Sequence, residues 1–540
     1  MNGINLSDAE CAIEDPVATI ALERFHIPRL APLQRFAIAN ILEDARAAEE
    51  ERATRRQLVL FPTGFGKSIC FQLPALLLDG LSVVVYPLLA LMNDQKRRLD
   101  EASLPCALFR GGLSDEEWKR EEQSINSGKT AIVIANPEIL ATPKLQRFLS
   151  ERKVAHLVID EAHCIAEWGE TFRPSYLELG EIAQTLAPSV LSAFTATAGP
   201  DIIASIEKKL FLANPYRMVS AEADRTNVLY GAVHTLSPTR TLRTLVLSCK
   251  KPAIIFERSR PGVKMKAEAL RSNGCASVRF YHAGLSRKER EDIESWFQRS
   301  DDAVLVSTNA YGMGMDKKNI RTVIHMSLPD SPEAYIQEAG RGGRDGELAA
   351  AILIHDLGRD TAVHSGGEIS EYARSRSARL APYPALSSCR REFLLDALGE
   401  REMPVCGRCD NCIEGEDGDS LREVARELGR GAQGAMFAQL DVHILRAEGF
   451  LEALTVLGAH PRSFDETGLA EALAGKEGRG LGRRAILPGW SVDELRELID
   501  GLVFADMISK ARRGPWKGAI MLTDKGRLYY QAARKCARRT

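Results

Sequence analysis

A glycine-rich stretch, Phe61–Ser68 (FPTGFGKS), lies between two apolar runs and has the residue types of a phosphate-binding loop. Glycines let backbone amides close around phosphate oxygens, and the N-terminus of a following helix adds positive potential. Lys67 would reach the terminal phosphates and Ser68 would ligate Mg²⁺. The general pattern has glycine where Phe61 stands, so this loop is a variant, and a chance loop is the alternative. We expect a helix over Ile69–Leu78 and a nucleotide held by Thr63, Gly64, Gly66, Lys67 and Ser68.

An acidic pair follows another apolar run, in the sequence Asp160-Glu161-Ala162-His163 after Val154–Ile159. Acidic residues at the carboxyl end of a strand belong at the crevice where open α/β sheets bind ligands. There Asp160 would hold Mg²⁺ through water, Glu161 would orient or deprotonate the attacking water, and His163 would couple the site to a neighbour. A solvated acidic loop is the alternative, and the position downstream of a phosphate loop argues against it.

A third segment, Gln337–Gly346 (QEAGRGGRDG), carries two arginines three residues apart. On a glycine-flanked turn and helix, Arg341 and Arg344 can face one ligand. Phosphoryl transfer spreads negative charge over the equatorial oxygens, and an arginine offered to them stabilises the transition state strongly. We therefore count Gln337, Arg341 and Arg344 among the catalytic candidates, with a surface salt-bridge helix as the alternative.

Four of the eleven cysteines form a separate pattern, Cys389, Cys406, Cys409 and Cys412, with spacings of 17, 3 and 3. Four thiolates at such turns close a tetrahedral Zn²⁺ site and leave no open position for a substrate, so the predicted site is structural. An iron–sulfur cluster is the alternative. Disulfides are less expected in a reducing cytosol.

Two series of strand-like apolar runs must position these groups. Continuous Val/Ile/Leu runs are typical of strands buried on both faces, and their alternation with helix-length segments predicts parallel sheets. We expect two α/β lobes joined near residues 213–235, with a flexible break at 414–420 and helices from about Leu421. The runs are Leu58–Phe61, Val83–Tyr86, Ile132–Ala135, Leu157–Ile159 and Leu191–Thr195, then Ala253–Phe256, Val278–Tyr281, Val304–Ser307, Thr322–Met326 and Ala350–Ile354.

Composition sets the wider limits. With 540 residues, 45% of them hydrophobic and 27% charged, the chain predicts about three to five globular domains. Its net charge of −2 provides no global basic field, but residues 509–540 carry ten Lys or Arg against one Asp. That surplus suits a phosphate backbone, or else a solvated, frayed terminus. We expect no signal peptide and no membrane segment, and therefore a soluble, intracellular protein.

Residues 25–346 resemble a superfamily 2 helicase core, and in detail the RecQ family. The matching motifs, I to VI in the family's order, are Thr63–Ser68, Val83–Gln95 (Ia), Asn136–Glu138 (Ib), Asp160–His163, Ala193–Ala198, Ile254–Arg260, Ser307–Asp316 and Gln337–Gly346. The resemblance implies that Arg344 is the arginine finger and that Arg341 supports it or contacts the phosphates. It also implies that Gln34 reads adenine, although Ala31 and Leu33 replace the family's arginine and glycine and put adenine selectivity in doubt.

The same resemblance implies DNA contacts. Cys164–Tyr176 is similar to the family's aromatic-rich loop, in which Trp168 and Phe172 would stack on bases and Arg173 would meet a phosphate. Packing as a small core is the alternative. The Tyr281–Leu285 segment, with Arg287 and Arg290, would contact one strand's backbone, and from it we single out His282.

The C-terminal end resembles the family's winged helix, more weakly. We expect a helix over Ser491–Leu502, strands over Val503–Lys510 and Ala519–Leu522, and a DNA-binding hairpin tip made by Arg512, Arg513, Trp516 and Lys517. The alternative is that Trp516 packs against a neighbouring domain and the cations are solvated. We expect the family's accessory HRDC module to be absent.

The predicted fold class is α/β: two tandem RecA-like parallel-sheet lobes, a zinc-binding module and a winged-helix-like domain. The expected boundaries are residues 1–220, 221–360, 361–420 and 421–540. The predicted function is an ATP-dependent 3′-to-5′ DNA helicase of repair and recombination, with ATP, Mg²⁺ and Zn²⁺ as cofactors. Single-stranded and duplex or forked DNA would be its partners, protein partners stay open, and its place would be the cytoplasm, at the nucleoid in a bacterium.

Two other functions remain open. The first is an RNA helicase or a duplex translocase that does not separate strands. The second is a non-enzymatic zinc and winged-helix binding module with a dead motor, against which the intact Lys67, Asp160, Glu161 and Arg344 argue.

Overall fold

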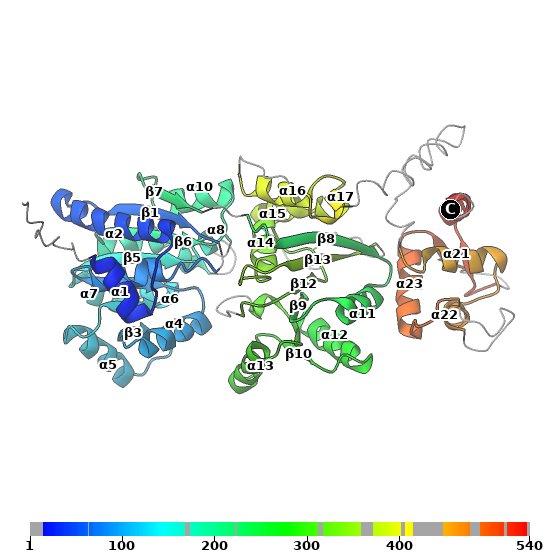
Figure 1. Cartoon of the computed structure of the whole chain (residues 1–540), viewed down its shortest axis with the longest axis horizontal. Coiled ribbons are helices and arrows are strands. Elements are labelled where there is room, and N and C mark those ends of the chain that lie inside the picture. Colours follow the sequence, from blue (N-terminus) through cyan, green and yellow to red (C-terminus); the bar gives the residue numbers. More distant parts are fainter. Residues whose placement is uncertain are drawn as a thin grey trace, which may run out of the picture. The chain divides into compact units, whose positions relative to one another are not determined.

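The computed structural model describes ten segments of the chain, which form two compact units, Met1–Ala223 and Asp224–Thr540. Each unit is described by itself (Figure 1). The segments are residues 15–62, 64–167, 173–221, 224–311, 317–357, 371–400, 406–413, 447–475, 486–511 and 516–536.

The first unit is built on a seven-stranded sheet in the order β3-β4-β2-β5-β6-β1-β7. All its strand pairs are parallel, and the central strands are buried along their whole length, as the continuous apolar runs predict. The strands are β1 (Arg55–Leu60), β2 (Leu81–Val85), β3 (Cys106–Phe109), β4 (Ile132–Ala135), β5 (Val154–Asp160), β6 (Val190–Thr195) and β7 (Arg217–Ser220).

Helices connect these strands, as parallel pairing requires. α2 packs its buried residues Ala37, Ile38 and Ile41 into the same core as β1 and β6. The helices of this unit are α1 (Pro16–Phe25), α2 (Pro32–Glu51), α3 (Ile69–Gln72), η1 (Pro74–Leu76), α4 (Leu89–Glu101), α5 (Asp115–Asn126), α6 (Pro137–Leu140), α7 (Pro143–Ser150), α8 (Cys164–Glu167), η2 (Pro174–Tyr176), α9 (Leu179–Leu186) and α10 (Pro200–Lys209).

The second unit contains a six-stranded parallel sheet in the order β10-β11-β9-β12-β13-β8. Two parallel-sheet lobes were therefore predicted correctly. The strands are β8 (Val228–Thr235), β9 (Ala253–Phe256), β10 (Val278–Tyr281), β11 (Val304–Ser307), β12 (Thr322–His325) and β13 (Ala349–Asp356), and the helices among them are α11 (Pro238–Ser248), α12 (Arg260–Ser272), α13 (Arg287–Arg299), η3 (Asn309–Tyr311) and α14 (Pro332–Ala339).

The cysteine-bearing module lies against the β8 edge of this sheet (Figure 1). The Asp410 carboxylate accepts a hydrogen bond from the Ala232 amide of β8 at 2.9 Å, so the module satisfies part of a strand edge that would otherwise face solvent. Its elements are α15 (Glu371–Leu380), η4 (Tyr383–Ala385), α16 (Arg390–Ala397) and α17 (Asp410–Ile413).

In its described residues, 447–475, 486–511 and 516–536, the C-terminal domain has three helices, a two-stranded antiparallel hairpin and a last helix around their own apolar core. The predicted helix and the two strands of the hairpin are present, whereas the winged-helix assignment of the domain stays a prediction. The elements are α21 (Phe450–Ala459), α22 (Glu466–Ala474), α23 (Val492–Phe504), β14 (Ile508–Lys510), β15 (Ile520–Leu522) and α24 (Asp524–Cys536).

Two predicted elements were wrong in extent, and the joint between the lobes lies within its expected range. The helix expected over Ile69–Leu78 ends at Gln72 and continues as a short 3-10 turn from Pro74, because proline cannot donate the next helical hydrogen bond. The two units divide between residues 223 and 224, inside the 213–235 range expected for the joint, and that range also contains β7 and β8, which were not predicted. The strand expected over Val503–Lys510 begins only at Ile508, since α23 continues to Phe504, and α24 was not predicted.

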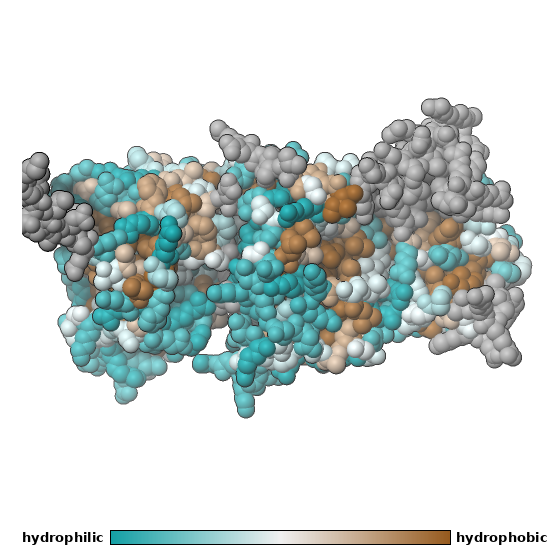
Figure 2. Space-filling view, in the orientation of Figure 1, coloured by the Kyte–Doolittle hydropathy of each residue, from teal (hydrophilic) through white to brown (hydrophobic). Residues whose placement is uncertain are grey.

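The surface is mixed in character. The face drawn in Figure 2 is hydrophilic around α5 and α13, and hydrophobic residues gather on the second unit and the C-terminal domain. None of the helices in the described segments combines the length and apolar character that a bilayer crossing requires.

Candidate nucleotide, metal and nucleic-acid sites

The glycine-rich loop leaves the carboxyl end of β1 with Gly64 and Gly66 in left-handed backbone conformations, at φ of 88° and 83°. A side chain at Gly66 would be strained, and its Cβ would lie 2.6 Å from the Gln34 amide nitrogen. Lys67 Nζ lies 3.5 Å from the Phe61 carbonyl oxygen, across the loop. The loop therefore has the backbone shape that a phosphate cradle needs; Thr63 lies outside the described residues.

Gln34 supports this loop from α2. Its amide nitrogen donates to the Phe65 carbonyl oxygen at 2.7 Å, and its amide oxygen accepts from the Ala31 backbone N–H at 2.8 Å. Sequence reasoning treated Gln34 as an adenine reader and missed this bracing role. The adenine contact stays a prediction.

The end of β6 joins the two nucleotide motifs. Phe61 N–H donates to the Thr195 carbonyl at 3.0 Å, and Ala162 N–H donates to the Phe194 carbonyl at 2.9 Å. The Thr195 hydroxyl donates to the Thr197 carbonyl, so it must accept from Nδ1 of the buried His163 at 2.9 Å. These bonds bring the loop, the acidic pair and the Ala193–Ala198 segment to one edge of the sheet.

The acidic pair is held in a buried setting at this edge. Burial, and then the negative charge of Glu161, raise the pKa of the Asp160 carboxyl, whereas Lys67 lowers it. A divalent cation is the partner that favours the charged form of such a carboxylate. Glu161 adopts a left-handed backbone at φ of 50°, and its carboxylate lies 3.5 Å from His163 Nδ1. The carboxylate of Asp160, which suits a divalent cation, is thus close to that of Glu161, which suits a water molecule.

In the second unit, the loop after α14 presents the two candidate arginines. Arg341 is buried and Arg344 is half-buried. The Arg225 guanidinium donates to three carbonyl oxygens of this loop, those of Gly340, Gly342 and Gly343, at 3.2, 3.1 and 2.9 Å.

Asn227 completes the support, because its amide nitrogen donates to the carbonyls of Gly343 and Glu347 at 2.7 and 2.8 Å. Sequence reasoning missed Arg225 and Asn227. Polar residues two apart directly before a strand were the only signal. Gln337, on α14 itself, is half-buried.

The four predicted zinc ligands come together. The Sγ atoms of Cys389, Cys406, Cys409 and Cys412 all lie within 4.8 Å of one another. A tetrahedral site with Zn–S bonds of about 2.3 Å places its sulfurs about 3.8 Å apart, so the cluster fits that ion after a small contraction. Backbone N–H groups of Glu392 and Cys409 donate to Sγ of Cys389 and Cys406, both at 3.4 Å, which suits thiolates.

Ion pairs fasten this cluster to the lobe. Arg390, only 2% exposed, donates to Asp410 at 2.6 Å, and Asp410 also accepts from β8. Arg391 makes two hydrogen bonds to Asp224, one of them at 2.7 Å.

Among the predicted DNA contacts of the first unit, Arg173 makes a two-point ion pair with Glu138, at 2.5 and 2.7 Å, and also donates to the Pro87 carbonyl. This ties the end of the aromatic-rich segment to the segments that resemble motifs Ia and Ib. Trp168 and Phe172 lie outside the described residues, and the phosphate contact of Arg173 stays a prediction.

The remaining predicted contacts belong to the second unit. His282 is half-buried and stacks on Phe280, with ring centroids 5.7 Å apart. Trp516 is 50% exposed at the hairpin, with the Arg462 guanidinium 5.9 Å from its ring centre, and Lys517 is exposed. Arg512 and Arg513 lie outside the described residues.

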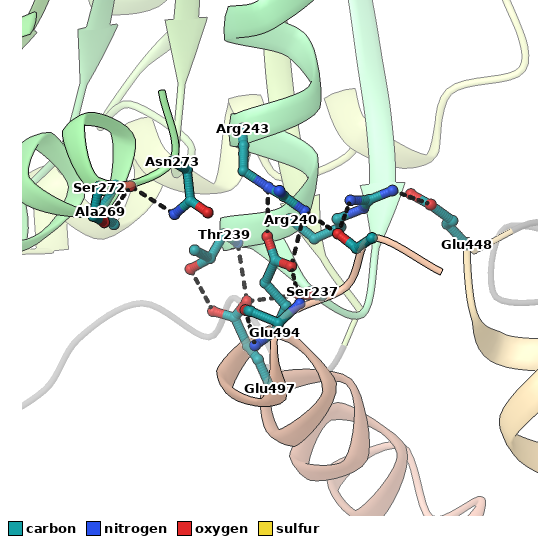
Figure 3. Close-up of polar contacts among 12 residues, drawn as sticks. Ser237, Thr239, Arg240, Arg243, Ala269, Ser272, Asn273, Glu448, Glu494 and Glu497 are labelled. Atoms are coloured by element: carbon teal, nitrogen blue, oxygen red, sulfur yellow. Dashed lines mark hydrogen bonds and ion pairs between the residues drawn. The ribbon is translucent and has the colours of Figure 1, made fainter. Parts of the chain in front are cut away.

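A polar clamp holds the C-terminal domain to α11, and we define it by the residues Ser237, Thr239, Arg240, Arg243, Glu448, Glu494 and Glu497 (Figure 3). Glu497 accepts from the Ser237 hydroxyl and the Thr239 amide, both at 2.9 Å, at the N-terminus of α11. Arg243 pairs with the buried Glu494 at 2.8 Å. Leu236, just before α11, is buried in the core of the C-terminal domain.

Comparisons with known proteins agree with this architecture. Three family models match the chain: DEAD/DEAH box helicase at residues 31–205, helicase conserved C-terminal domain at 238–346, and RecQ zinc-binding at 359–413. Among solved structures, the helicase MrfA bound to DNA is similar with a TM-score of 0.50 and 22% identity, covering 64% of this chain and 51% of that one. At that identity the likeness supports the fold alone.

Curated relatives carry the family assignment. The ATP-dependent DNA helicase RecQ of Pasteurella multocida is 35% identical over 364 residues, which cover 66% of this chain and 57% of the relative. The match to the ATP-dependent DNA helicase RecQ of Haemophilus influenzae covers 58% of that relative. The chain thus spans less than two thirds of these relatives. The Bacillus subtilis RecQ is 30% identical over 472 residues, or 84% of this chain and 75% of the relative. The chain belongs to the RecQ helicase family.

Proposed function

We propose that this chain is an ATP-dependent DNA helicase that translocates 3′ to 5′ and separates duplex strands in DNA repair and recombination. The observation that carries the proposal is the junction at the end of β6, where the phosphate loop and the acidic pair are hydrogen-bonded to one strand. The direction and the biological role come from the likeness to RecQ proteins.

In the first unit, the loop amides and Lys67 would bind the phosphates of ATP, and Ser68 and Asp160 would hold Mg²⁺. The ion would neutralise charge on the phosphate oxygens. Glu161 would orient and deprotonate the attacking water. His163, fixed by Thr195, would keep Glu161 in place, because its Nδ1 lies near both groups.

In the second unit, Arg344 would supply positive charge to the transition state, and Arg341 would support it. Burial lowers the pKa of Arg225, and the positive charge of Arg344 lowers it further. The four cysteines would hold Zn²⁺ as a structural ion, and the exposed Trp516 at the hairpin would contact DNA at the duplex end.

One set of assays tests the proposal. ATP hydrolysis is measured with no nucleic acid, with single-stranded DNA and with single-stranded RNA, beside unwinding of 3′- and 5′-tailed duplexes. We expect stimulation by DNA and unwinding of the 3′-tailed DNA duplex only. Stimulation by RNA in place of DNA would assign the RNA helicase alternative, and hydrolysis without unwinding would assign a translocase. Lys67→Ala is the inactive control, and absence of hydrolysis in the parent overturns the proposal.

A further inference from the structure

A short segment at the start of the second unit, Asp224–Asn227, touches two parts of the molecule at once. Asp224 pairs with Arg391 of the cysteine module, and Arg225 donates to the loop that carries Arg341 and Arg344. Because Asp224 and Arg225 are consecutive, their backbone cannot shift for one contact without disturbing the other.

The Arg225 contacts hold the turn that follows α14. Three terminal carbonyls of the helix itself already accept from the backbone N–H groups of residues 340–342, so Arg225 binds carbonyls that lie beyond the helix. The half-buried guanidinium satisfies three of these carbonyls with a rigid, planar set of donors. A lysine ammonium is a single point donor and cannot span them in the same way.

Contacts other than those of Arg225 also restrict the loop that carries Arg341 and Arg344. Gly343 adopts φ of 58°, and a Cβ there would lie 2.3 Å from the Glu347 carbonyl oxygen and 2.5 Å from the Asn227 amide. Gly343 N–H donates to the Ile320 carbonyl at 2.8 Å, and Asp345 forms a two-point pair with Arg321 at 3.0 and 2.6 Å. The direction of Arg344, between Gly343 and Asp345, therefore depends on this cage.

The Asp224–Arg391 pair is well shielded, since the two side chains are 10% and 6% exposed. Arg391 lies on α16 two residues after Cys389, which is the N-cap of that helix and the first candidate zinc ligand, so the pair lies beside the cysteine cluster. A continuous set of contacts thus runs from the cysteine cluster through Arg391 and Asp224 to Arg225.

We propose that Asp224 and Arg225 are positioning residues for ATP hydrolysis: Arg225 sets the direction of Arg341 and Arg344, and Asp224 fixes Arg225 to the cysteine module. The attachment of that module then governs the hydrolysis rate of a site to which it contributes no reacting group. This inference rests on the proposed function for its catalytic consequence, whereas its structural part stands alone.

The experiment compares full-length Arg225→Ala, Arg225→Lys, Asp224→Asn and Asp224→Glu with the parent. Lys264→Ala is the matched control, because Lys264 pairs only with the exposed Glu268 on α12. Two quantities are measured for each: kcat and KM for ATP with saturating single-stranded DNA, and hydrogen–deuterium exchange of the backbone amides of residues 332–348 without nucleotide. Melting temperatures identify variants that fail to fold.

For Arg225→Ala we expect kcat to fall about 100-fold with KM changed less than about twofold, since misplacing a catalytic group by about 1 Å can cost that factor. Arg225→Lys should recover only part of the rate. Asp224→Asn should lower kcat roughly 2- to 30-fold, the range of couplings transmitted through packed networks, and Asp224→Glu should recover part of it. Exchange in residues 332–348 should rise in the Ala and Asn variants and stay at the parent level in Lys264→Ala.

Unchanged exchange and unchanged kcat in Arg225→Ala would overturn the inference. Raised exchange with parent kcat would overturn its catalytic part, and a change in KM alone would assign Arg225 to nucleotide binding instead. If the parent itself hydrolyses no ATP, the proposed function fails, while the exchange measurement still decides whether Asp224 and Arg225 hold the loop.

Discussion

The second lobe carries two appended parts, and they are attached in different ways. The cysteine module is fastened at the β8 edge by buried ion pairs, one of which adjoins the segment that holds the Arg344 loop. The C-terminal domain is fastened at α11 by the polar clamp and by Leu236, which is 1% exposed in that domain's core. Under the proposed function, we expect the place of attachment to decide which activity a module affects: ATP hydrolysis for the cysteine module and strand separation for the C-terminal domain.

The energetics of the two attachments also differ. Breaking a buried ion pair leaves an uncompensated charge and is strongly destabilising, even where the pair as a whole adds little stability. The pairs of Arg390 and Arg391 in the module are of this kind. The clamp combines one buried carboxylate, that of Glu494, with more exposed partners such as Glu448. The apolar contact of the C-terminal domain with the lobe is made separately, by Leu236. Single changes in the clamp should therefore loosen the C-terminal domain without unfolding the lobe.

The largest expected effect sets the reference for this comparison. Arg344→Ala should slow ATP hydrolysis by about 10³-fold or more, the factor associated with arginine fingers, and should spare ATP binding. Single-turnover hydrolysis and binding of a fluorescent ATP analogue measure the two quantities. Glu161→Gln is the companion variant, with binding retained and water activation lost. Hydrolysis at the parent rate in Arg344→Ala would remove the arginine-finger assignment.

Removing Arg390 tests the attachment of the cysteine module. Arg390→Ala leaves Asp410 without its ion-pair partner and should lower the free energy of unfolding by roughly 3–5 kcal/mol. Urea titration followed by tryptophan fluorescence measures it, with zinc content determined by elemental analysis at about one ion per chain in the parent. Arg408→Ala, an exposed arginine of the same module, is the control and should match the parent. Equal stability of the two variants would show that the module is not fastened as described.

A smaller effect is expected when the clamp is opened. Arg243→Ala removes the partner of Glu494, so the C-terminal domain should lose its fixed position on α11. Unwinding of tailed duplex should slow roughly tenfold, which corresponds to about 1.4 kcal/mol in a barrier, while DNA-stimulated ATP hydrolysis persists.

A double-mutant cycle with Glu494→Gln should give a coupling of about 0.5–3 kcal/mol. Arg496→Ala, on the exposed side of α23, is the matched control. Loss of both activities in Arg243→Ala would mean that the two attachments do not separate the two functions.

How far the sequence predicts this structure depends on the range of the interactions involved. Local patterns sufficed for the buried strands and for the cysteine cluster, because apolar runs and C-x₂-C turns are short-range signals. They failed where a contact joins distant segments: Gln34 to Phe65, Arg225 to Gly343, and Glu497 to Thr239. β7 and β8 were not predicted as strands, because they are edge strands whose mixed burial lacks a continuous apolar run.

The smallest expected effect concerns the hairpin of the C-terminal domain. Trp516 is half exposed and the Arg462 guanidinium lies 5.9 Å from its ring centre, so within the described part of the chain no neighbouring domain encloses the side chain. Stacking of a base on an aromatic ring is worth about 1–3 kcal/mol, enough to offset part of the cost of opening one base pair. Trp516→Ala should therefore slow unwinding only a few-fold, by less than opening the clamp, because it removes one contact and leaves the domain in place. ATP hydrolysis stimulated by single-stranded DNA and the melting temperature should both match the parent. Trp516→Phe keeps an aromatic face and should restore most of the unwinding rate. A lower melting temperature in Trp516→Ala, or an equal loss in the Phe variant, would assign Trp516 to packing with Arg462 instead of to the duplex end.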